Sequence, residues 1–426
     1  MAAELGIAVL GAGTVGATVA RELVVHADRL ADRSGGRLVL RRVAERDPER
    51  SRGLAARGVT IDADAAAAVA APDVDIVVEL LGGLEPAGTL LGSALERGLG
   101  VVTANKAVIA TSGHRLVAAV RTGSGGLAFE AAVGAAIPVL ALLRDSLRGD
   151  GIHRVTAVIN GTTNHILGRL EAGDDFDRAV ADAQERGYAE ANPTNDLDGH
   201  DAAQKLCILA WFAMGAEVRP DQVLRRGIRD IDPSDVMAAA RLGSVIRLVA
   251  RAERTEAGLA LSVQPTLLPR SGHPLSDLEG ADNAVVLESD LAGRLVLRGR
   301  GAGAEAAASA VLSDIVAVAR ARRAGREVPQ AMAAPAPVLD GETAQTAAWL
   351  RVRVDGSPDA PDMVAGELAR GGVVVEQITP MGTGDELAVL VSRTARATLA
   401  RGLAALESAG LLAKVVQQLD RLGTTA

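Results

Sequence analysis

A glycine-rich segment near the N-terminus constrains the fold of this chain more than any other feature of the sequence. GAGTVG (11–16) follows the apolar run IAVL and leads into VGATVARELV, which has the apolar period of a helix. In this context Gly11 allows a tight turn, Gly13 lets a pyrophosphate approach the backbone and Gly16 permits close helix packing. The N-terminus of the helix would face the phosphates. The pattern predicts a dinucleotide-binding domain, with a turn that holds no ligand as the alternative.

Three further apolar runs indicate a parallel sheet in this first part of the chain. They are LVLRRVAE (38–45), IVVELLG (76–82) and GVVTAN (100–105), and each is continuous rather than alternating. Continuous runs are expected for strands that helices cover on both faces. Helical patterns lie between them, as in βαβ units. We therefore expect an α/β fold with a Rossmann-type parallel sheet.

The residues after the second predicted strand bear on the choice between NAD and NADP. An acidic residue at this point usually binds the ribose 2′-hydroxyl, and an arginine accommodates a 2′-phosphate. Glu45 is available for the first role. Arg46 is the foremost candidate for the second, with Arg50 and Arg52 close by. Both cofactors stay open, and a solvated loop also explains the arginines.

The length of the chain, 426 residues, is too large for one ordinary domain. We expect the dinucleotide-binding domain at 1–137 and an α+β substrate-binding and dimerisation domain at 138–299. The long helix at 304–321, which follows a strand ending in glycines at 294–303, should return to the first domain, so that about 300–321 completes it. Residues 322–345 lack a clear period and are predicted to be a linker.

Residues 346–426 have the pattern of a small, separate α+β unit. The runs LRVRVD, VVVEQI, ELAVLVS and AKVVQQL predict four strands, and two amphipathic helices lie between them. The resulting order is βαββαβ, which is typical of a ferredoxin-like module. A regulatory role would suit such a module.

The composition excludes several classes of function. The net charge is −8 and no basic patch is interleaved with aromatic residues, which argues against nucleic acid as a partner. The apolar run at 127–143 is interrupted by Glu130 and Pro138, so it does not predict a membrane span. Cys207 is the only cysteine and the six histidines are scattered, which disfavours a disulfide and a zinc site. The N-terminus lacks a signal-peptide pattern, and we expect a cytoplasmic protein.

The stretch YAEANPTNDLDGHDAAQKL (188–206) places charge at the start of a helix that continues as the apolar CILAWFAMG. Asp201 and Lys205 are four residues apart, on one face of this helix. An exposed pair of this spacing contributes only roughly 0.3–0.5 kcal/mol. At the rim of a buried helix, however, the lysine would be partly desolvated and able to donate a proton. A solvated loop ahead of a core helix is the alternative interpretation.

Two other segments place polar groups after predicted strands. Lys106, in TANKAVIA, follows a strand of the parallel sheet, and ligands bind beyond the carboxyl ends of such strands. NGTTN (160–164) also ends a strand, and its amides and hydroxyls are suited to holding a carboxylate. Taken alone, NGTTN is better explained as a turn with a helix N-cap.

Together these segments resemble homoserine dehydrogenases over nearly the whole length of the chain. The most specific part is AQERGYAEANPTNDLDGHDAAQK (183–205). It is accompanied, in the right order, by GAGTVG, VELLGGLEP, TANKAVIA, FEAAVGAAIP, INGTTN and RGAGA. The resemblance implies reduction of L-aspartate 4-semialdehyde to L-homoserine with NADPH or NADH, on the route to threonine and methionine.

The resemblance also implies roles for individual residues. Lys205 matches the proton donor, Asp201 a residue that organises it, and Lys106 a lysine that contacts substrate and nicotinamide. The implied substrate contacts are Glu190, Asp196, Asp201, Tyr188, Gly161 and Thr162. The implied cofactor contacts beyond Gly11, Gly13, Gly16 and Arg46 are Thr14, Val15, Gly82, Thr103, Lys106, Gly301 and Gly303. A monovalent cation, usually sodium, is implied at Glu130, Val133, Ala135 and Ile137.

The C-terminal unit resembles an ACT domain, which is a small-molecule sensor. Relatives typically have a Pro-Gly pair between its first strand and helix, where this chain has Pro361-Asp362. Pro361 lacks an amide donor, and the carboxylate of Asp362 would repel the carboxylate of an amino-acid effector. We expect weak or no inhibition by threonine, and a homodimer or homotetramer.

Two other functions remain as alternatives. An amino-acid dehydrogenase acting at the α-carbon also uses lysines and carboxylates, but it would release ammonia. A nucleotide-binding sensor would bind the cofactor and never oxidise it. The presence of both Lys106 and Lys205 argues against the sensor.

Overall fold

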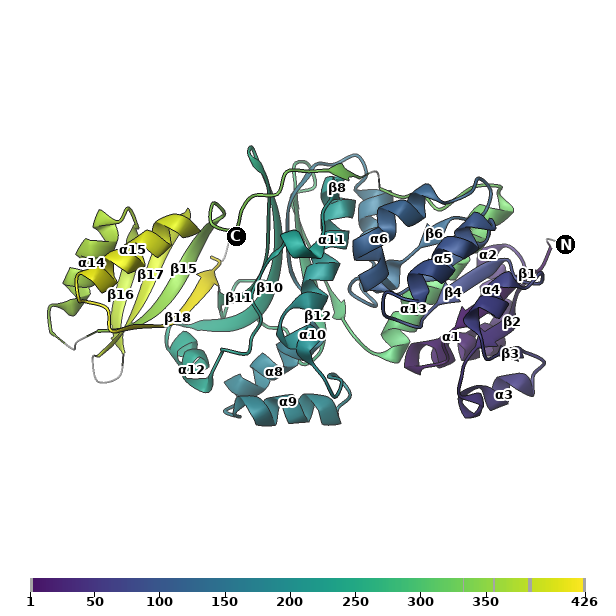
Figure 1. The fold of residues 1–426 in the computed structure, drawn as a ribbon, viewed down its shortest axis with the longest axis horizontal. Coiled ribbons are helices and arrows are strands. Elements are labelled where there is room, and N and C mark those ends of the chain that lie inside the picture. The colour runs from purple at the N-terminus through teal and green to yellow at the C-terminus, as the bar shows by residue number, and fades with distance from the viewer. Residues whose placement is uncertain (1–2, 332, 355–356, 382–384, 424–426) are drawn as a thin grey trace.

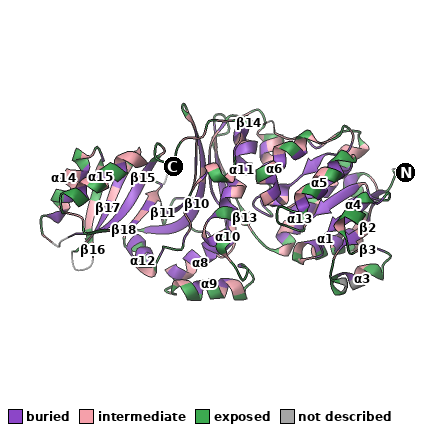
Figure 2. Cartoon of the chain, viewed as in Figure 1, coloured by how far each residue is buried: buried purple, intermediate pink, exposed green. Residues whose placement is uncertain are grey.

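The structure, a computed structural model, describes residues 3–331, 333–354, 357–381 and 385–423. Three units follow one another along the long axis of the molecule, with the N-terminal unit at one end and the C-terminal unit at the other (Figure 1). Buried residues occupy most of the strands in all three units, and exposed residues cover the outer faces of helices (Figure 2). Within the described ranges, no helix is both long and apolar enough to cross a membrane.

The N-terminal unit contains a six-stranded parallel sheet in the order β3-β2-β1-β4-β5-β6. This is the strand order of dinucleotide-binding folds, and it confirms the predicted Rossmann-type sheet. Its strands are β1 (Leu5–Leu10), β2 (Leu38–Ala44), β3 (Thr60–Asp62), β4 (Ile76–Glu79), β5 (Gly100–Thr103) and β6 (Leu127–Ala128). Its helices are α1 (Thr14–Val25), α2 (Ala27–Ser34), α3 (Arg52–Ala55), α4 (Ala65–Ala70), α5 (Ala87–Glu96) and α6 (Lys106–Ala118).

The long helix α13 (Ala304–Arg323) returns to this first sheet, as predicted. Val311, Ile315 and Val318 on α13 share one hydrophobic core with β1 and α1. The strand before it, β13 (Arg294–Arg300), stays in the middle unit. β13 pairs with β12 (Asp282–Ser289) in an antiparallel hairpin of the middle unit, because only a short turn connects the two strands.

The middle unit packs helices against a mixed sheet. Its strands are β7 (Ile152–Val158), β8 (Ala216–Glu217), β9 (Leu224–Arg225), β10 (Ser244–Thr255), β11 (Gly258–Pro269), β12 and β13. Its helices are α7 (Val139–Ala141), α8 (Gly161–Glu171), α9 (Phe176–Glu185), α10 (Thr194–Leu197), α11 (His200–Met214) and α12 (Pro233–Arg241). Helix α11 is buried along most of its length and joins the core of the first sheet to that of the middle sheet.

The C-terminal unit has the predicted βαββαβ order. Its elements are β15 (Gln345–Arg353), α14 (Ala360–Arg370), β16 (Val375–Met381), β17 (Glu386–Ala395), α15 (Arg396–Ser408) and β18 (Lys414–Arg421). It has a core of its own. Its sheet, however, is joined to the middle unit, whereas the sequence predicted a separate unit. β18 pairs with β11, so one sheet runs from β13 to β16 across both units. Pro361 and Asp362 lie within the first turn of α14 rather than in a turn ahead of it.

The segment predicted to be a linker lies against the middle unit instead of connecting two units loosely. Within it, β14 (Ala334–Pro335) pairs with β8, and Val338 forms a bridge with Leu259. These contacts involve only one or two residues at a time. Such short pairings leave no periodic pattern, so the sequence alone does not distinguish this segment from a linker.

Candidate active site

Two lysines from different units contact the same carboxylate. Nζ of Lys106, the first residue of α6, lies 3.0 Å from Oδ1 of Asp201. Nζ of Lys205, on α11, lies 2.7 Å from Oδ2 of the same residue. Asp201 is buried, whereas 35% of the Lys106 side chain and 12% of the Lys205 side chain are exposed. The structure therefore joins the two lysines that the sequence singled out separately.

Local structure explains how both lysines reach Asp201. Asn105 caps α6 by accepting a hydrogen bond from the amide of Val108, and its side-chain amide donates to the carbonyl of Gly83. Gly199 adopts a left-handed φ of 76°, which lets the chain turn from α10 into α11. Asp201 then falls in the first turn of α11, where the helix dipole favours a negative charge.

Asn160 connects the carboxylates of the site, and the sequence analysis did not include it among the site residues. Its Nδ2 lies 2.7 Å from Oδ1 of Asp196 and 2.8 Å from Oδ2 of Asp201. Its Oδ1 accepts from the amide of Thr163 and so caps α8. The carbonyl of the preceding residue, Ile159, accepts a hydrogen bond from Lys205 at 2.8 Å. The only sequence signal was the motif INGTTN, which a helix cap alone would explain.

The electrostatics of the cluster follow from these contacts. Burial alone would raise the pKa of Asp201, but Lys205 and Lys106 together with their hydrogen bonds hold it below its usual range. The charge of Asp201 raises the pKa of Lys106 against the effect of burial. Burial, and then the charge of Asp201, raise the pKa of Asp196. The cluster thus has one firmly ionised carboxylate beside a second that lacks a cation in direct contact.

A cavity of about 620 Å³ lies beyond the carboxyl ends of the first strands. Gly11, Gly13, Arg46 and Gly82, all predicted to bind the cofactor, are among its lining residues. A Cβ atom at Gly16 would lie 1.9 Å from the carbonyl oxygen of Gly11, so this position requires glycine. The cavity therefore has the glycine turn and the helix N-terminus that a pyrophosphate needs.

Models of two parts of one family match the chain. The model of the homoserine dehydrogenase NAD-binding domain matches residues 11–130, and the model of homoserine dehydrogenase matches residues 138–316. The chain belongs to the homoserine dehydrogenase family. The homoserine dehydrogenase of Mycobacterium tuberculosis is 42% identical to it over 90% of this chain and 88% of the relative. Homoserine dehydrogenases are NAD(P)-dependent oxidoreductases, and this chain is one of them.

Solved structures of homoserine dehydrogenases have the same fold. The homoserine dehydrogenase from Thiobacillus denitrificans is 34% identical in sequence to this chain, and its crystal structure matches with a TM-score of 0.92. The match covers 99% of this chain and 99% of the other. A hyperthermophilic archaeal homoserine dehydrogenase in complex with NADPH is 28% identical, with a TM-score of 0.63 over 74% of this chain and 97% of its own.

Other residues that the homoserine dehydrogenase resemblance implied lie around the Asp201 cluster. Gly161 and Thr162 begin α8 directly after Asn160, and the Thr162 hydroxyl donates to the carbonyl of Tyr188 at 2.6 Å. The Tyr188 ring contacts that of His165 edge-on. Glu190 is exposed, and its charge acts on Lys106. The signature segment of the family is thus folded back over the start of α8.

The remaining predicted cofactor residues of this homoserine dehydrogenase occupy different surroundings. Thr14 and Val15 begin α1, and Gly301 and Gly303 precede α13. None of the four lines the 620 Å³ cavity. Thr103 is fully buried, and its hydroxyl donates to Glu79 at 2.6 Å.

Glu79 also accepts from the amides of Leu81 and Gly82. Thr103 therefore supports the 80–83 loop from inside the unit, and its buried hydroxyl is not available to a ligand in the cavity. Glu79 was missed by the sequence analysis, where it was a residue of an apolar strand.

The residues matched to the cation loop of homoserine dehydrogenases form a tight turn beside α13. Glu130 is buried, and the amides of Leu140 and Ala141 donate to its carboxylate at 2.8 and 2.7 Å. Ala135 has a φ of 48°, a left-handed conformation that is costly for a residue with a side chain. Asp314 accepts from the amide of Glu130, and burial followed by the charge of Glu130 raises the pKa of Asp314 to about 8.

Proposed function

We propose that the enzyme reduces L-aspartate 4-semialdehyde to L-homoserine, with Lys205 as the proton donor to the aldehyde oxygen. The observation that carries this proposal is the convergence of Lys106 and Lys205 on Asp201 beside the nucleotide-binding unit. The nicotinamide cofactor, when bound, supplies the hydride. The remaining requirements are a proton, a site for the ammonium group and a fixed geometry, and side chains of this chain can meet all three.

Lysine is the residue type that the proton transfer needs. Arginine keeps its proton throughout the accessible pH range and cannot donate it. The chain has 45 lysine and arginine residues, and lysine stands only at positions 106, 205 and 414. Two of these lysines contact Asp201. In a chain that otherwise uses arginine, this placement supports a role that arginine cannot fill.

The hydrogen-bond inventory divides the roles of the two lysines. An ammonium group has three N–H donors. Lys205 uses one on Asp201 and one on the carbonyl of Ile159, so one remains and its direction is fixed. Lys106 has a single ion-pair contact, with Asp201, and is more exposed. Lys205 is the better-positioned proton donor, and Lys106 is free to turn towards substrate or nicotinamide.

The same inventory assigns the carboxylates. Asp201 already accepts from both lysines and from Asn160, so its role is to organise them. Within the described part of the chain, Asp196 accepts a side-chain hydrogen bond from Asn160 alone, and Glu190 is exposed nearby. Asp196 and Glu190 therefore bind the ammonium group of the substrate. Gly161, Thr162 and Tyr188 complete the substrate pocket at the start of α8.

NADPH is the proposed cofactor. Glu45, the candidate for binding the ribose of NAD, accepts from the amides of Ala12 and Asp47 at 2.9 and 3.0 Å. Arg46 and Arg50 line the same cavity; Arg50 pairs with Asp47 at 3.5 Å, which leaves Arg46 as the foremost candidate for a 2′-phosphate. The side chain of Arg52 lies outside the described part of the structure. Removing the Arg46 guanidinium by Arg46→Ala should raise the KM for NADPH and leave that for NADH almost unchanged.

A monovalent cation, sodium by resemblance, would be held by the main chain at Glu130, Val133, Ala135 and Ile137. Hard cations prefer oxygen ligands, and a turn with consecutive left-handed residues, Gly134 and Ala135, directs carbonyls to one side. Glu130 and Asp314 are buried beside the turn. These residues fit such a cation without any side-chain ligand.

The division of the chain is proposed as follows. Residues 1–137 with 300–321 form the cofactor unit, 138–299 the substrate and dimerisation unit, and 346–426 an ACT-like module. Strand β13 lies at an open edge of the long sheet, and an open edge is suited to pairing with a second copy in a homodimer or homotetramer. Threonine should inhibit weakly, because Pro361 and Asp362 occupy the first turn of α14.

One assay tests the function directly. Oxidation of NADPH and of NADH is followed spectrophotometrically with L-aspartate 4-semialdehyde as substrate, and ammonia is measured in parallel. The proposal requires semialdehyde-dependent oxidation without ammonia. Ammonia release would indicate an amino-acid dehydrogenase acting at the α-carbon, and cofactor binding without any oxidation would indicate a sensor.

A further inference from the structure

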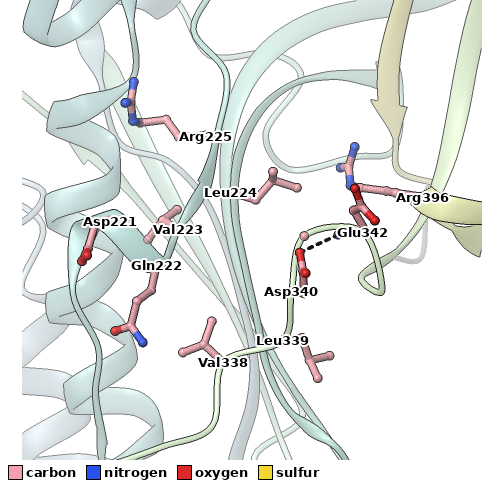
Figure 3. A pocket seen from close by; sticks show the side chains of 11 residues that line it. Asp221, Gln222, Val223, Leu224, Arg225, Val338, Leu339, Asp340, Glu342 and Arg396 are labelled. Atoms are coloured by element: carbon pink, nitrogen blue, oxygen red, sulfur yellow. Dashed lines mark hydrogen bonds between the residues drawn. The ribbon is translucent and has the colours of Figure 1, made fainter. Parts of the chain in front are cut away.

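A short segment connects the C-terminal unit to the helix that carries Asp196. Strand β9 forms one wall of a cavity of about 560 Å³, with residues 338–342 and Arg396 on the other side (Figure 3). The chain leaves β9 and runs through residues 226–232, here called the connecting segment, into α12. One side of this segment contacts β18 of the C-terminal unit, and the other contacts α10.

The contacts to the C-terminal unit are polar and largely buried. Arg226 donates to the side chain of Gln417 and to the carbonyl of Gln418. Gln417, which is 3% exposed, donates to the carbonyl of Asp230 at 3.1 Å and to Asp235 at 3.0 Å. The connecting segment is therefore held at both ends by a single side chain of β18.

The contacts to α10 are equally direct. The guanidinium of Arg229 donates to Asp198 Oδ1 at 2.5 Å and to the Thr194 hydroxyl at 3.1 Å, so it contacts both ends of the helix. The amide of Ile228 donates to the carbonyl of Leu197 at 2.8 Å. A Cβ atom at Gly227 would lie 2.0 Å from that carbonyl oxygen, so glycine is required for this approach.

Helix α10 depends on such support. It has only four residues, and a helix this short has little stability of its own. Asp196 lies in it, and its carboxylate is 2.7 Å from Asn160, the residue that also contacts Asp201. The position of Asp196 relative to the lysines therefore depends on what holds α10 from outside.

We propose that Arg229 is a positioning residue for substrate binding, which acts through α10 on Asp196 and is itself held by the C-terminal unit through the connecting segment. The inference rests on the proposed function, in which Asp196 binds the ammonium group of the substrate. Arg229 does not contact the lysines and has no part in proton transfer. Its loss changes the affinity for the semialdehyde and leaves the chemical step intact.

The test is the kinetics of Arg229→Ala in the full-length enzyme. We expect the KM for the semialdehyde to rise about 3–10-fold, the scale of losing one partly exposed charge-assisted contact, with kcat and the KM for NADPH unchanged. Arg229→Lys should restore part of the affinity. Arg219→Ala is the matched control, because Arg219 is also an exposed arginine paired with an aspartate, Asp221, but does not contact α10.

A second variant tests the other end of the segment. Gln417→Met removes the polar contacts to Asp230 and Asp235 and should raise the same KM in the same direction, by less than Arg229→Ala does. An unchanged KM for the semialdehyde in an active Arg229→Ala enzyme would overturn the inference alone. An equal rise in the KM for NADPH would overturn it too, since it would indicate a general structural role. A wild-type enzyme without semialdehyde-dependent activity would instead remove the proposed function on which the inference rests.

Discussion

Asp201 and Asp235 are two buried aspartates with similar local settings and different surroundings. Each lies in the first turn of a helix, α11 or α12, and each contacts one basic side chain from another unit, Lys106 or Arg351. Asp201 contacts two lysines. Asp235 contacts Arg351 at 2.8 Å and accepts from Gln417 at 3.0 Å. One cluster lies where the cofactor and substrate units meet, and the other lies where the C-terminal unit meets the middle unit.

The difference lies in unused hydrogen-bonding capacity. Arg351 and Gln417 are 8% and 3% exposed, and they donate to Glu386, Asp235 and the carbonyl of Asp230 within the protein. Burial raises the pKa of Asp235 although Gln417 and Arg351 oppose it. The partners of Asp201, by contrast, retain N–H groups and partial exposure. We therefore expect the Asp201 cluster, whose lysines keep free donors, to take part in chemistry, and the Asp235 cluster to hold the two units together.

The largest effect that we expect comes from the Asp201 cluster. Lys205→Ala removes the proposed proton donor and should lower kcat by roughly 10²–10⁴-fold, with NADPH binding near normal. Steady-state kinetics and cofactor fluorescence titration measure the two quantities. Lys414→Ala, at an exposed position of β18, is the control. Near wild-type turnover in folded Lys205→Ala would mean that the two clusters do not differ as described.

The Asp235 cluster should respond in stability rather than in turnover. Arg351→Met removes the guanidinium that the carboxylates of Asp235 and Glu386 share. Breaking a buried ion pair in this way lowers the free energy of unfolding by about 3–5 kcal/mol. We expect a fall in Tm of several degrees while kcat stays within about twofold of wild type. Thermal unfolding and kinetics on one preparation measure both.

Arg353→Met is the matched control for Arg351→Met, because Arg353 also contacts Glu386 but is half-exposed. An Arg351→Met enzyme with unchanged Tm and reduced kcat would assign the Asp235 cluster to catalysis instead.

Much of this molecule could be predicted because its signals are local. Gly11 provides the left-handed turn and Gly16 the space for close packing, and the continuous apolar strands specify a covered parallel sheet. The choice of lysine at 106 and 205, in a chain that otherwise uses arginine, is also a signal visible in the sequence. The contact of Lys106 with Asp201 is not visible in the sequence, because it arises from the packing of α6 against α11.

The features that were missed depend on contacts between distant segments. Asn160 caps α8, which hides its second role as a donor to Asp196 and Asp201. The joining of β18 to β11 uses backbone groups that every residue has, so the sequence could not distinguish it from a separate unit. Thr103, which the resemblance implied as a cofactor contact, donates its hydroxyl to Glu79, a buried partner that the strand pattern did not reveal.

The smallest expected effect is a dependence of kcat/KM on pH. It distinguishes Asp196 from Asp235, two carboxylates whose pKa burial raises. Burial, and then the charge of Asp201, raise the pKa of Asp196, whereas Asp201 stays ionised because the lysines hold its pKa low. As the pH falls through the raised pKa, Asp196 becomes neutral and loses its attraction for the substrate ammonium group. The value of kcat/KM for the semialdehyde should therefore decline on the acid side, by less than about tenfold, since this ratio reports ionisation of the free enzyme.

Asp196→Asn should lower kcat/KM and flatten this acid limb, whereas Asp235→Asn should leave its midpoint in place, although burial raises the pKa of Asp235 as well. A midpoint that moves in Asp235→Asn and stays in Asp196→Asn would reverse the roles of the two clusters.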